Sequence, residues 1–211
     1  MNPEPGLRER KRQRTREAIA RAAHQLFVER GYEATTLPDI AEAADVSTRT
    51  IFAYFPSKED ILFCDFAPLK EALGRALAER PEGQDTLETV RAFIVSSHQE
   101  EKSELKEGLN RIIQNDATLR THLRARLAEL EELIAAAIAE DLGAAETDLR
   151  PQVVAASLIA AFDVLMERGE GPTPKQSAEE VAAQIDPVMS FLRGGLEALK
   201  EPRRFRRTAL R

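Results

Sequence analysis

Few residues of this 211-residue chain have types and spacings that suit metal binding or redox chemistry. His98 and Glu101 share a helical face at a three-residue spacing, and His122 follows on a later helix, so the three can in principle bind a metal ion. Since no second paired motif accompanies them, we favour a chance arrangement and predict no metal site and no cofactor. Cys64 is the single cysteine, and its apolar and acidic neighbours predict a buried, unreactive thiol.

Motifs of common enzymes are missing from the sequence. It has no Gly-x-Ser-x-Gly elbow, no phosphate-binding loop and no doubled Glu-x-x-His motif. The acidic residues fall mainly on polar helix faces, where solvation explains them. We therefore predict that the protein is not an enzyme.

A different chemistry is available at residues 47–50, where a serine, two threonines and an arginine are gathered. Arg49 can donate two hydrogen bonds to a guanine, and the methyl groups of Thr48 and Thr50 can touch a thymine methyl. At the start of a helix that enters the major groove, these residue types would suit the recognition of base edges in DNA. Which of the three would read bases is left open by the sequence.

Charge is distributed unevenly along the chain, whose formal net charge is −6. Residues 1–16 carry six basic and two acidic side chains, residues 61–198 carry fourteen and twenty-five, and residues 199–211 carry six and one. Basic ends often bind polyanions, although solvated tails are about as common. For the N-terminal arm we favour DNA contact, through Arg14 and Arg16 in particular, and for the C-terminal tail we favour solvation.

Composition and hydrophobic periodicity predict an all-α protein of about nine helices, because Ala, Leu, Glu and Arg dominate and no strand-period run occurs. The first helix should run from about residue 8 to residue 30 and stop at Gly31. Thr36 and Asp39 predict a capping box at the start of a second helix, 37–44, which tolerates a proline in its first turn. Ser47 should cap a third helix at about 48–54.

Longer helices are expected in the remainder. One should start behind Ser57 and run from about 58 to 80 with a bend at Pro68, and others should cover 86–101 behind Thr86, 103–115, 118–142, 149–168 and 177–200. The last two are apolar on more than one face, which predicts burial inside a domain or against a partner. The sequence contains no secretory signal and no membrane-length apolar run, so we expect a soluble cytoplasmic protein with no membrane contact.

The stretch GYEATTLPDIAEAADVSTRTIFAYFPSKEDIL, residues 31–62, resembles the DNA-binding domain of the TetR family of transcriptional regulators. The resemblance implies a homodimer in which a helix-turn-helix domain precedes a larger ligand-sensing domain. We accordingly expect a DNA-binding domain at 1–56, a ligand-binding and dimerisation domain at 57–200 and a basic tail at 201–211. The shared positions are Gly31-Tyr32, Thr35-Thr36, Ile40-Ala41, Val46-Ser47, Tyr54-Phe55 and Ser57-Lys58-Glu59.

In a helix-turn-helix, one helix braces the DNA backbone and the next enters the major groove, which here assigns these roles to 37–44 and 48–54. Ile51 and Phe55 are the apolar members of the reading helix that can pack inward. The resemblance further implies that Thr36, Tyr54 and Lys58 hold the DNA backbone.

The chain departs from the family pattern at two positions. Phe52 replaces a tyrosine found in many members, which removes one hydroxyl donor. Asp45 stands where glycine often closes the turn, and because Asp tolerates the left-handed conformation we expect the turn to be kept.

These observations predict a dimeric, sequence-specific regulator, most simply a repressor that a small molecule releases from a palindromic operator on double-stranded DNA. The dimer surface is expected on the helices near 149–168 and 177–200. The segment RIIQNDATLR at 111–120, followed by the long helix and DLRPQVV at 148–154, loosely resembles actinobacterial members with acyl-type or redox-cofactor-linked regulation, which favours a hydrophobic, acyl-like effector. The alternative is a structural helical dimer whose basic arm binds polyanions without sequence preference.

Aromatic and polar side chains of the middle segment are the candidates for the effector pocket. Ordinary core packing is the competing role for each phenylalanine. The candidates are Phe63, Phe66, Phe93, His98, Arg111, Asn115, His122 and Phe162.

Overall fold

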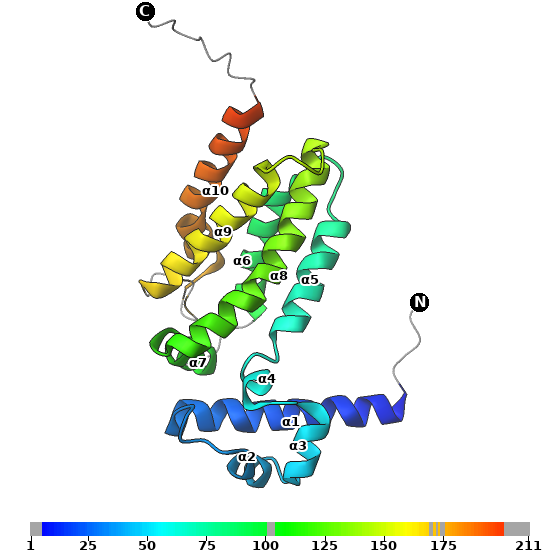
Figure 1. Ribbon diagram of the computed structural model, residues 1–211, viewed down its shortest axis with the longest axis vertical. Coiled ribbons are helices and arrows are strands. Elements are labelled where there is room, and N and C mark those ends of the chain that lie inside the picture. The colour runs from blue at the N-terminus through cyan, green and yellow to red at the C-terminus, as the bar shows by residue number, and fades with distance from the viewer. Residues whose placement is uncertain (1–5, 101–103, 169–170, 172, 174–175, 201–211) are drawn as a thin grey trace, which may run out of the picture. The chain divides into compact units, whose positions relative to one another are not determined.

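The computed structural model describes residues 6–100, 104–168, 171, 173 and 176–200, without the side chains of 98–100, 104 and 198–200. Its described residues form ten helices and no strand, which confirms the predicted all-α fold (Figure 1). None of the described helices combines the length and the hydropathy that a membrane span requires. The helices are α1 Leu7–Arg30, α2 Leu37–Ala43, α3 Thr48–Tyr54, α4 Lys58–Leu62, α5 Phe66–Ala78, α6 Thr86–Glu100, α7 Glu104–Asn115, α8 Ala117–Leu142, α9 Arg150–Glu167 and α10 Ala178–Lys200.

The chain divides into two compact units. Unit 1 consists of residues 1–72 and 102–126, and unit 2 of residues 73–101 and 127–211. Unit 1 thus contains the segment predicted to be the DNA-binding domain and adds α4, the first half of α5, α7 and the first turns of α8. The basic tail, 201–211, lies outside the described residues.

Unit 1 is built around α1, which packs against α2, α4 and α7, while α2 packs against α3 (Figure 1). The inner face of α1 buries Ile19, Ala23, Leu26 and Phe27. Helix α7 approaches α1 closely, because a side chain at Gly108 would place its Cβ 2.8 Å from Val28 Cγ2. Gly31 ends α1 with a φ of +89°, a conformation that glycine adopts without strain.

The prediction of a single helix from about residue 58 to residue 80 is wrong. The structure has two helices there, α4 and α5, separated by residues 63–65. The N–H of Phe63 still donates to Glu59 O, whereas those of Cys64 and Phe66 donate to carbonyls only three residues back, which tightens the chain into a turn. Pro68 does not bend a long helix: it stands in the first turn of α5, where a missing N–H costs no hydrogen bond.

Two side chains of α1 fasten the end of α4. The buried His24 donates from Nε2 to Ile61 O at 2.9 Å, and Arg16 donates from Nη2 to Cys64 O at 3.3 Å. Ile61 O also accepts the N–H of Cys64, whereas Cys64 O cannot accept a helical bond from residue 68, because Pro68 has no N–H. Arg126 of α8 lies 4.3 Å above the ring of Phe63 and pairs with Asp60 at 3.6 Å. Helix α4 is therefore fixed to both α1 and α8.

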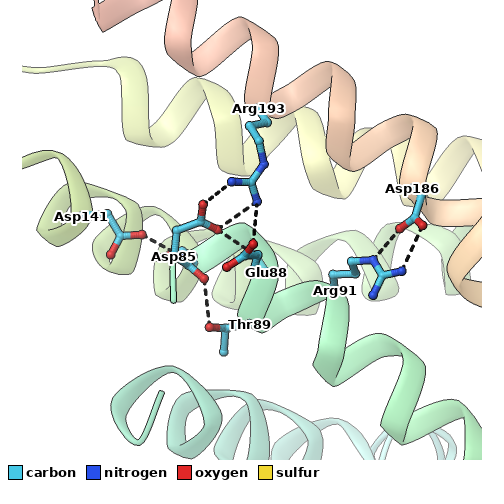
Figure 2. A network of polar contacts seen from close by, with 8 residues as sticks. Asp85, Glu88, Thr89, Arg91, Asp141, Asp186 and Arg193 are labelled. Carbon is cyan, nitrogen blue, oxygen red and sulfur yellow. Dashed lines mark hydrogen bonds and ion pairs between the residues drawn. The ribbon is translucent and has the colours of Figure 1, made fainter. Parts of the chain in front are cut away.

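In unit 2, α10 packs against α6 and α9. Figure 2 shows the polar contacts that join α10 to α6. Arg193 donates to both carboxylate oxygens of Asp85, at 2.6 and 3.3 Å, and lies 3.7 Å from Glu88. One turn further along α6, Arg91 donates to Asp186 at 2.5 and 3.0 Å. The two pairs hold the helices together at two points.

The hydrogen bonds from Arg91 hold the pKa of Asp186 below its ordinary value. Because the folded-state pKa lies below the unfolded one of about 4, this pair stabilises the fold at neutral pH. Its contribution is lost as the pH falls through the acid range in which Asp186 is protonated.

Asp85 rather than Thr86 caps α6, which corrects the predicted cap. Asp85 Oδ1 accepts the N–H of Glu88 at 2.8 Å, while the N–H of Thr86 donates to Asp141 Oδ2 of α8 at 2.8 Å. Asp85 therefore has two tasks, as a helix cap and as the partner of Arg193.

We expect Asp85→Ala to lower the free energy of unfolding by about 1–2 kcal/mol, since it removes a cap and an ion pair. Arg193→Ala should cost less than about 1 kcal/mol, because it removes only a half-exposed pair. Urea titrations followed by circular dichroism measure both, with the exposed Glu82→Ala as the control. Equal losses for the two variants would show that the cap contributes nothing.

Candidate nucleic-acid interface

The start of α2 is fixed by the predicted capping box, which the structure confirms. Thr36 donates its N–H to Asp39 Oδ2 at 2.8 Å, and Thr36 Oγ1 accepts the N–H of Asp39 at 3.3 Å. The Thr36 hydroxyl also donates to Asp39 Oδ2 at 2.5 Å, and these bonds from Thr36 lower the pKa of Asp39. The exposed Thr36 thus orients the helix start that would face a DNA backbone.

The turn between α2 and α3 keeps its left-handed residue, although this residue is Asp45 and not glycine. Asp45 adopts a φ of +53°, as predicted for this position. The N–H of Val46 closes the turn by donating to Ala41 O at 2.9 Å. Ser47 then caps α3, accepting the N–H of Thr50 at 3.1 Å.

Helix α3 has one buried side and one exposed side. Ile51 and the capping residue Phe55 are 0% and 2% exposed, which confirms their predicted inward packing. The Thr50 hydroxyl lies 2.8 Å from Ser47 Oγ and forms a hydrogen bond with this capping residue. Arg49 is exposed and Thr48 is half-buried. Of the three residues that were candidates for reading bases, Arg49 is therefore the one whose polar head is most available.

Lys58 connects α4 to the turn that follows α1. Its ammonium donates to Tyr32 O at 2.8 Å and Thr35 O at 3.2 Å, and it lies 4.1 Å from the centre of the Tyr32 ring. Tyr32 is buried, and burial together with the nearby Glu59 raises the pKa of its hydroxyl. Lys58 thus has structural partners inside unit 1, and its contact with DNA stays a prediction.

The basic residues at the start of α1 fall on different faces. Arg8, Lys11, Arg12 and Thr15 line a hollow of about 680 Å³ together with the acidic Glu9 and with Ala53 and Tyr54 of α3. Arg10 and Arg14 line a neighbouring hollow with the acidic Glu9 and Glu17. Basic groups beside the reading helix are placed to contact phosphates, which flank the major groove.

Of the two arm residues that we expected at DNA, Arg14 is exposed but Arg16 is engaged inside unit 1. Arg16 lies 5.0 Å from the Phe55 ring in addition to its bond to Cys64 O. Arg8, Lys11, Arg12 and Thr15, which line the hollow beside α3, have the spacing i, i+3, i+4 and i+7, which marks one face of a helix. That spacing was the signal in the sequence that distinguishes them from Arg10 and Arg14.

Cys64 is buried, as predicted, and burial raises the pKa of its thiol to about 12. Among the described residues, no group of three His, Cys, Asp or Glu side chains could hold a metal ion. The side chain of His98 and all of Glu101 lie outside the described residues.

The residues predicted to line an effector pocket divide between the two units. Phe63 is buried in the core of unit 1 beneath Arg126, while Phe66 and His122 are half-buried there. Arg111 and Asn115 are exposed on α7 and line an open groove against α1. In unit 2, Phe93 of α6 and Phe162 of α9 are half-buried.

A capped brace helix, a left-handed turn and a short helix with one exposed face define a helix-turn-helix DNA-binding protein. Sequence comparison agrees, because the profile of bacterial regulatory proteins of the tetR family matches residues 19–63 and that of the MftR C-terminal domain matches residues 84–197. The chain belongs to the TetR family of transcriptional regulators. Like the members of this family, it is a DNA-binding transcription regulator.

Individual relatives extend this likeness. The chain is 35% identical over 162 residues to the transcriptional regulator TcmR of Streptomyces glaucescens, covering 72% of this chain and 71% of TcmR. It is 28% identical over 152 residues to MftR of Mycobacterium tuberculosis, covering 71% and 77%, and the name of MftR links it to mycofactocin biosynthesis. The structure matches FadR of Thermus thermophilus, a TetR-family repressor in complex with lauroyl-CoA, with a TM-score of 0.56 and 28% identity over 85% of this chain and 94% of FadR.

We expect the double variant Arg8→Ala/Arg12→Ala to reduce the magnitude of the slope of log K for DNA binding against log salt concentration by about 2. Each lost phosphate contact removes about 0.9 from the slope. Fluorescence anisotropy on a random duplex at several salt concentrations measures it. The matched control, Arg10→Ala/Arg14→Ala, removes the same charge from the other face and should change the slope by less than about 1. If both pairs change the slope equally, the face beside α3 has no special role.

Proposed function

We propose that the protein is a homodimeric repressor that binds a palindromic operator and is released from it by a small hydrophobic effector of the acyl type. The observation that carries the proposal is the presence of two exposed surfaces of different chemistry. One is the reading face of α3 with the basic face of α1, and the other is an apolar stripe on α9 and α10. The first suits DNA, and the second suits a second copy of the chain.

The apolar stripe has helical spacing on both helices. On α9 it consists of Val153, Ala160 and Val164, which are exposed, with Ser157 between them. On α10 it contains Phe191, which is 75% exposed, and the small residues Gly194 and Gly195 one turn further on. Large exposed apolar side chains gathered on neighbouring helices are typical of subunit interfaces. Two copies joined there would present two reading helices to successive major grooves.

An acyl-type effector is supported by the likeness to FadR, whose structure holds lauroyl-CoA, at 28% identity. Phe93 and Phe162 supply half-buried aromatic surface in unit 2 that suits an acyl chain. Phe63 is a weaker candidate, since its ring is already covered by Arg126. Release requires that the effector bind the form with low operator affinity more tightly than the operator-bound form.

Dimer formation is tested by Val153→Glu/Phe191→Glu. Two charges placed in the apolar stripe should raise the dimer dissociation constant at least about 100-fold, because each would be buried without a partner. Sedimentation velocity at micromolar concentration should show a dimer for the wild type and a monomer for the variant, together with a loss of operator affinity. Gln152→Glu, which adds a charge to the exposed surface of α9, is the control and should remain dimeric. A wild type that sediments as a monomer would refute the proposed dimer.

The effector class is tested by titrating the protein–operator complex with lauroyl-CoA. We expect operator affinity to fall at least about tenfold at saturation, which corresponds to a difference of about 1.4 kcal/mol in effector binding between the two forms. Coenzyme A without an acyl chain should have no effect. Phe93→Ala/Phe162→Ala should weaken the response while keeping operator affinity. If acyl-CoA esters and free fatty acids of several lengths all leave operator binding unchanged, the effector is of another class, although the DNA-binding function stands.

A further inference from the structure

The reading face of α3 exposes a large apolar side chain. Phe52 is 55% exposed, although the helix it belongs to has buried positions at Ile51 and, at its end, Phe55. Among the described residues of unit 1, only Leu7, Val28 and Phe52 are exposed large apolar side chains, at 67%, 40% and 55%. Leu7 begins α1 and Val28 packs beside α7, whereas Phe52 stands between the exposed Arg49 and Ala53 on the surface that would enter DNA.

The chemistry of Phe52 limits what it can contact there. A phenyl ring has no hydrogen-bond donor or acceptor for a phosphate or for the polar edge of a base. The major groove displays one apolar group, the 5-methyl group of thymine, and phenylalanine is among the side chains that contact it. We propose that Phe52 reads a thymine in each half-site through its 5-methyl group. The inference rests on the proposed operator binding and adds a specificity determinant to it.

The spacing on α3 also places this thymine relative to the base that Arg49 reads. Phe52 follows Arg49 by three residues, so the two side chains share a face and are about 4.5 Å apart along the helix axis. Successive base pairs are about 3.4 Å apart. The thymine therefore lies one or two base pairs away from the guanine that Arg49 contacts. Thr50 stands two residues before Phe52, about 200° around the helix, so its methyl group lies on another side of α3.

The experiment removes single methyl groups from DNA. The operator is first obtained by selecting duplexes from a random pool with the full-length protein. Each thymine of the half-site is then replaced, symmetrically in both half-sites, by deoxyuridine, which lacks only the 5-methyl group. At one position, replacing thymine by deoxyuridine should weaken the binding of the wild-type protein about fourfold per half-site. This is the factor expected for losing the burial of one methyl-sized group. Phe52→Ala should bind the thymine and deoxyuridine operators equally.

Two further variants separate the role of Phe52 from general effects. Arg49→Ala should lose its preference at the neighbouring guanine and keep the difference between thymine and deoxyuridine. Phe52→Tyr keeps the ring and should also keep that difference, and circular dichroism verifies that each variant is folded. A wild type that tolerates deoxyuridine at every position, or a Phe52→Ala variant that still distinguishes the two bases, would overturn this inference while leaving operator binding intact. A pool that yields no enriched duplex would overturn both proposals.

Discussion

Helix α3 has seven residues, far fewer than the roughly 12–15 that an isolated helix needs to be even marginally stable in water. Its shape therefore depends on what is packed against it and on how its first turn is capped. Ile51 and Phe55 are buried in the core that α1 supplies, and Ser47 satisfies the N–H of Thr50. The rest of unit 1 can be understood as the means by which this short helix is held in one position with its outer face free.

Helix α1 meets this requirement and also carries charge to the same surface. Its inner face supplies Ile19 and Phe27 to the core, and Arg16 stacks on Phe55 next to the end of α3. Two turns earlier, Arg8 and Arg12 line the hollow beside Tyr54. One continuous helix thus couples the packing that fixes α3 to the basic groups that would meet phosphates. The formal net charge of −6 conceals this arrangement, because it averages the basic arm with an acidic remainder.

Local features of unit 1 were predictable from the sequence because they depend on residues three or four positions apart. The Thr36–Asp39 box, the Ser47 cap and the left-handed Asp45 each follow from side chains that bond to their own turn. Long-range partners were not predictable in this way. Nothing in the local sequence indicates that Arg16 bonds to the carbonyl of Cys64, 48 residues away, and its contact with DNA stays a prediction.

The break between α4 and α5 shows the same limit. Helical periodicity runs through residues 58–80, and Pro68 suggested only a bend. Part of the cause is local, because Pro68 has no N–H for Cys64 O and its ring would clash with that carbonyl in a continuous helix. The tertiary part could not be predicted: His24 of α1 donates to Ile61 O, and Arg16 donates to Cys64 O. One N–H group in the first turn of α6 likewise depends on a distant residue, since Asp141 of α8 accepts the N–H of Thr86.

These bonds also change how a signal would have to reach the reading helix. A single helix over 58–80 would act as a lever, but α4 has only five residues and is tied to α1 by His24 and to α8 by Arg126. Helix α8 runs from Ala117 to Leu142, and the part of it that carries Arg126 belongs to unit 1. A displacement of α8 would be passed through Arg126 to Asp60 and Phe63, and from α4 through His24 to the helix that holds α3. Since the packed contacts on α4 come from both sides, α4 cannot shift unless α1 or α8 shifts with it.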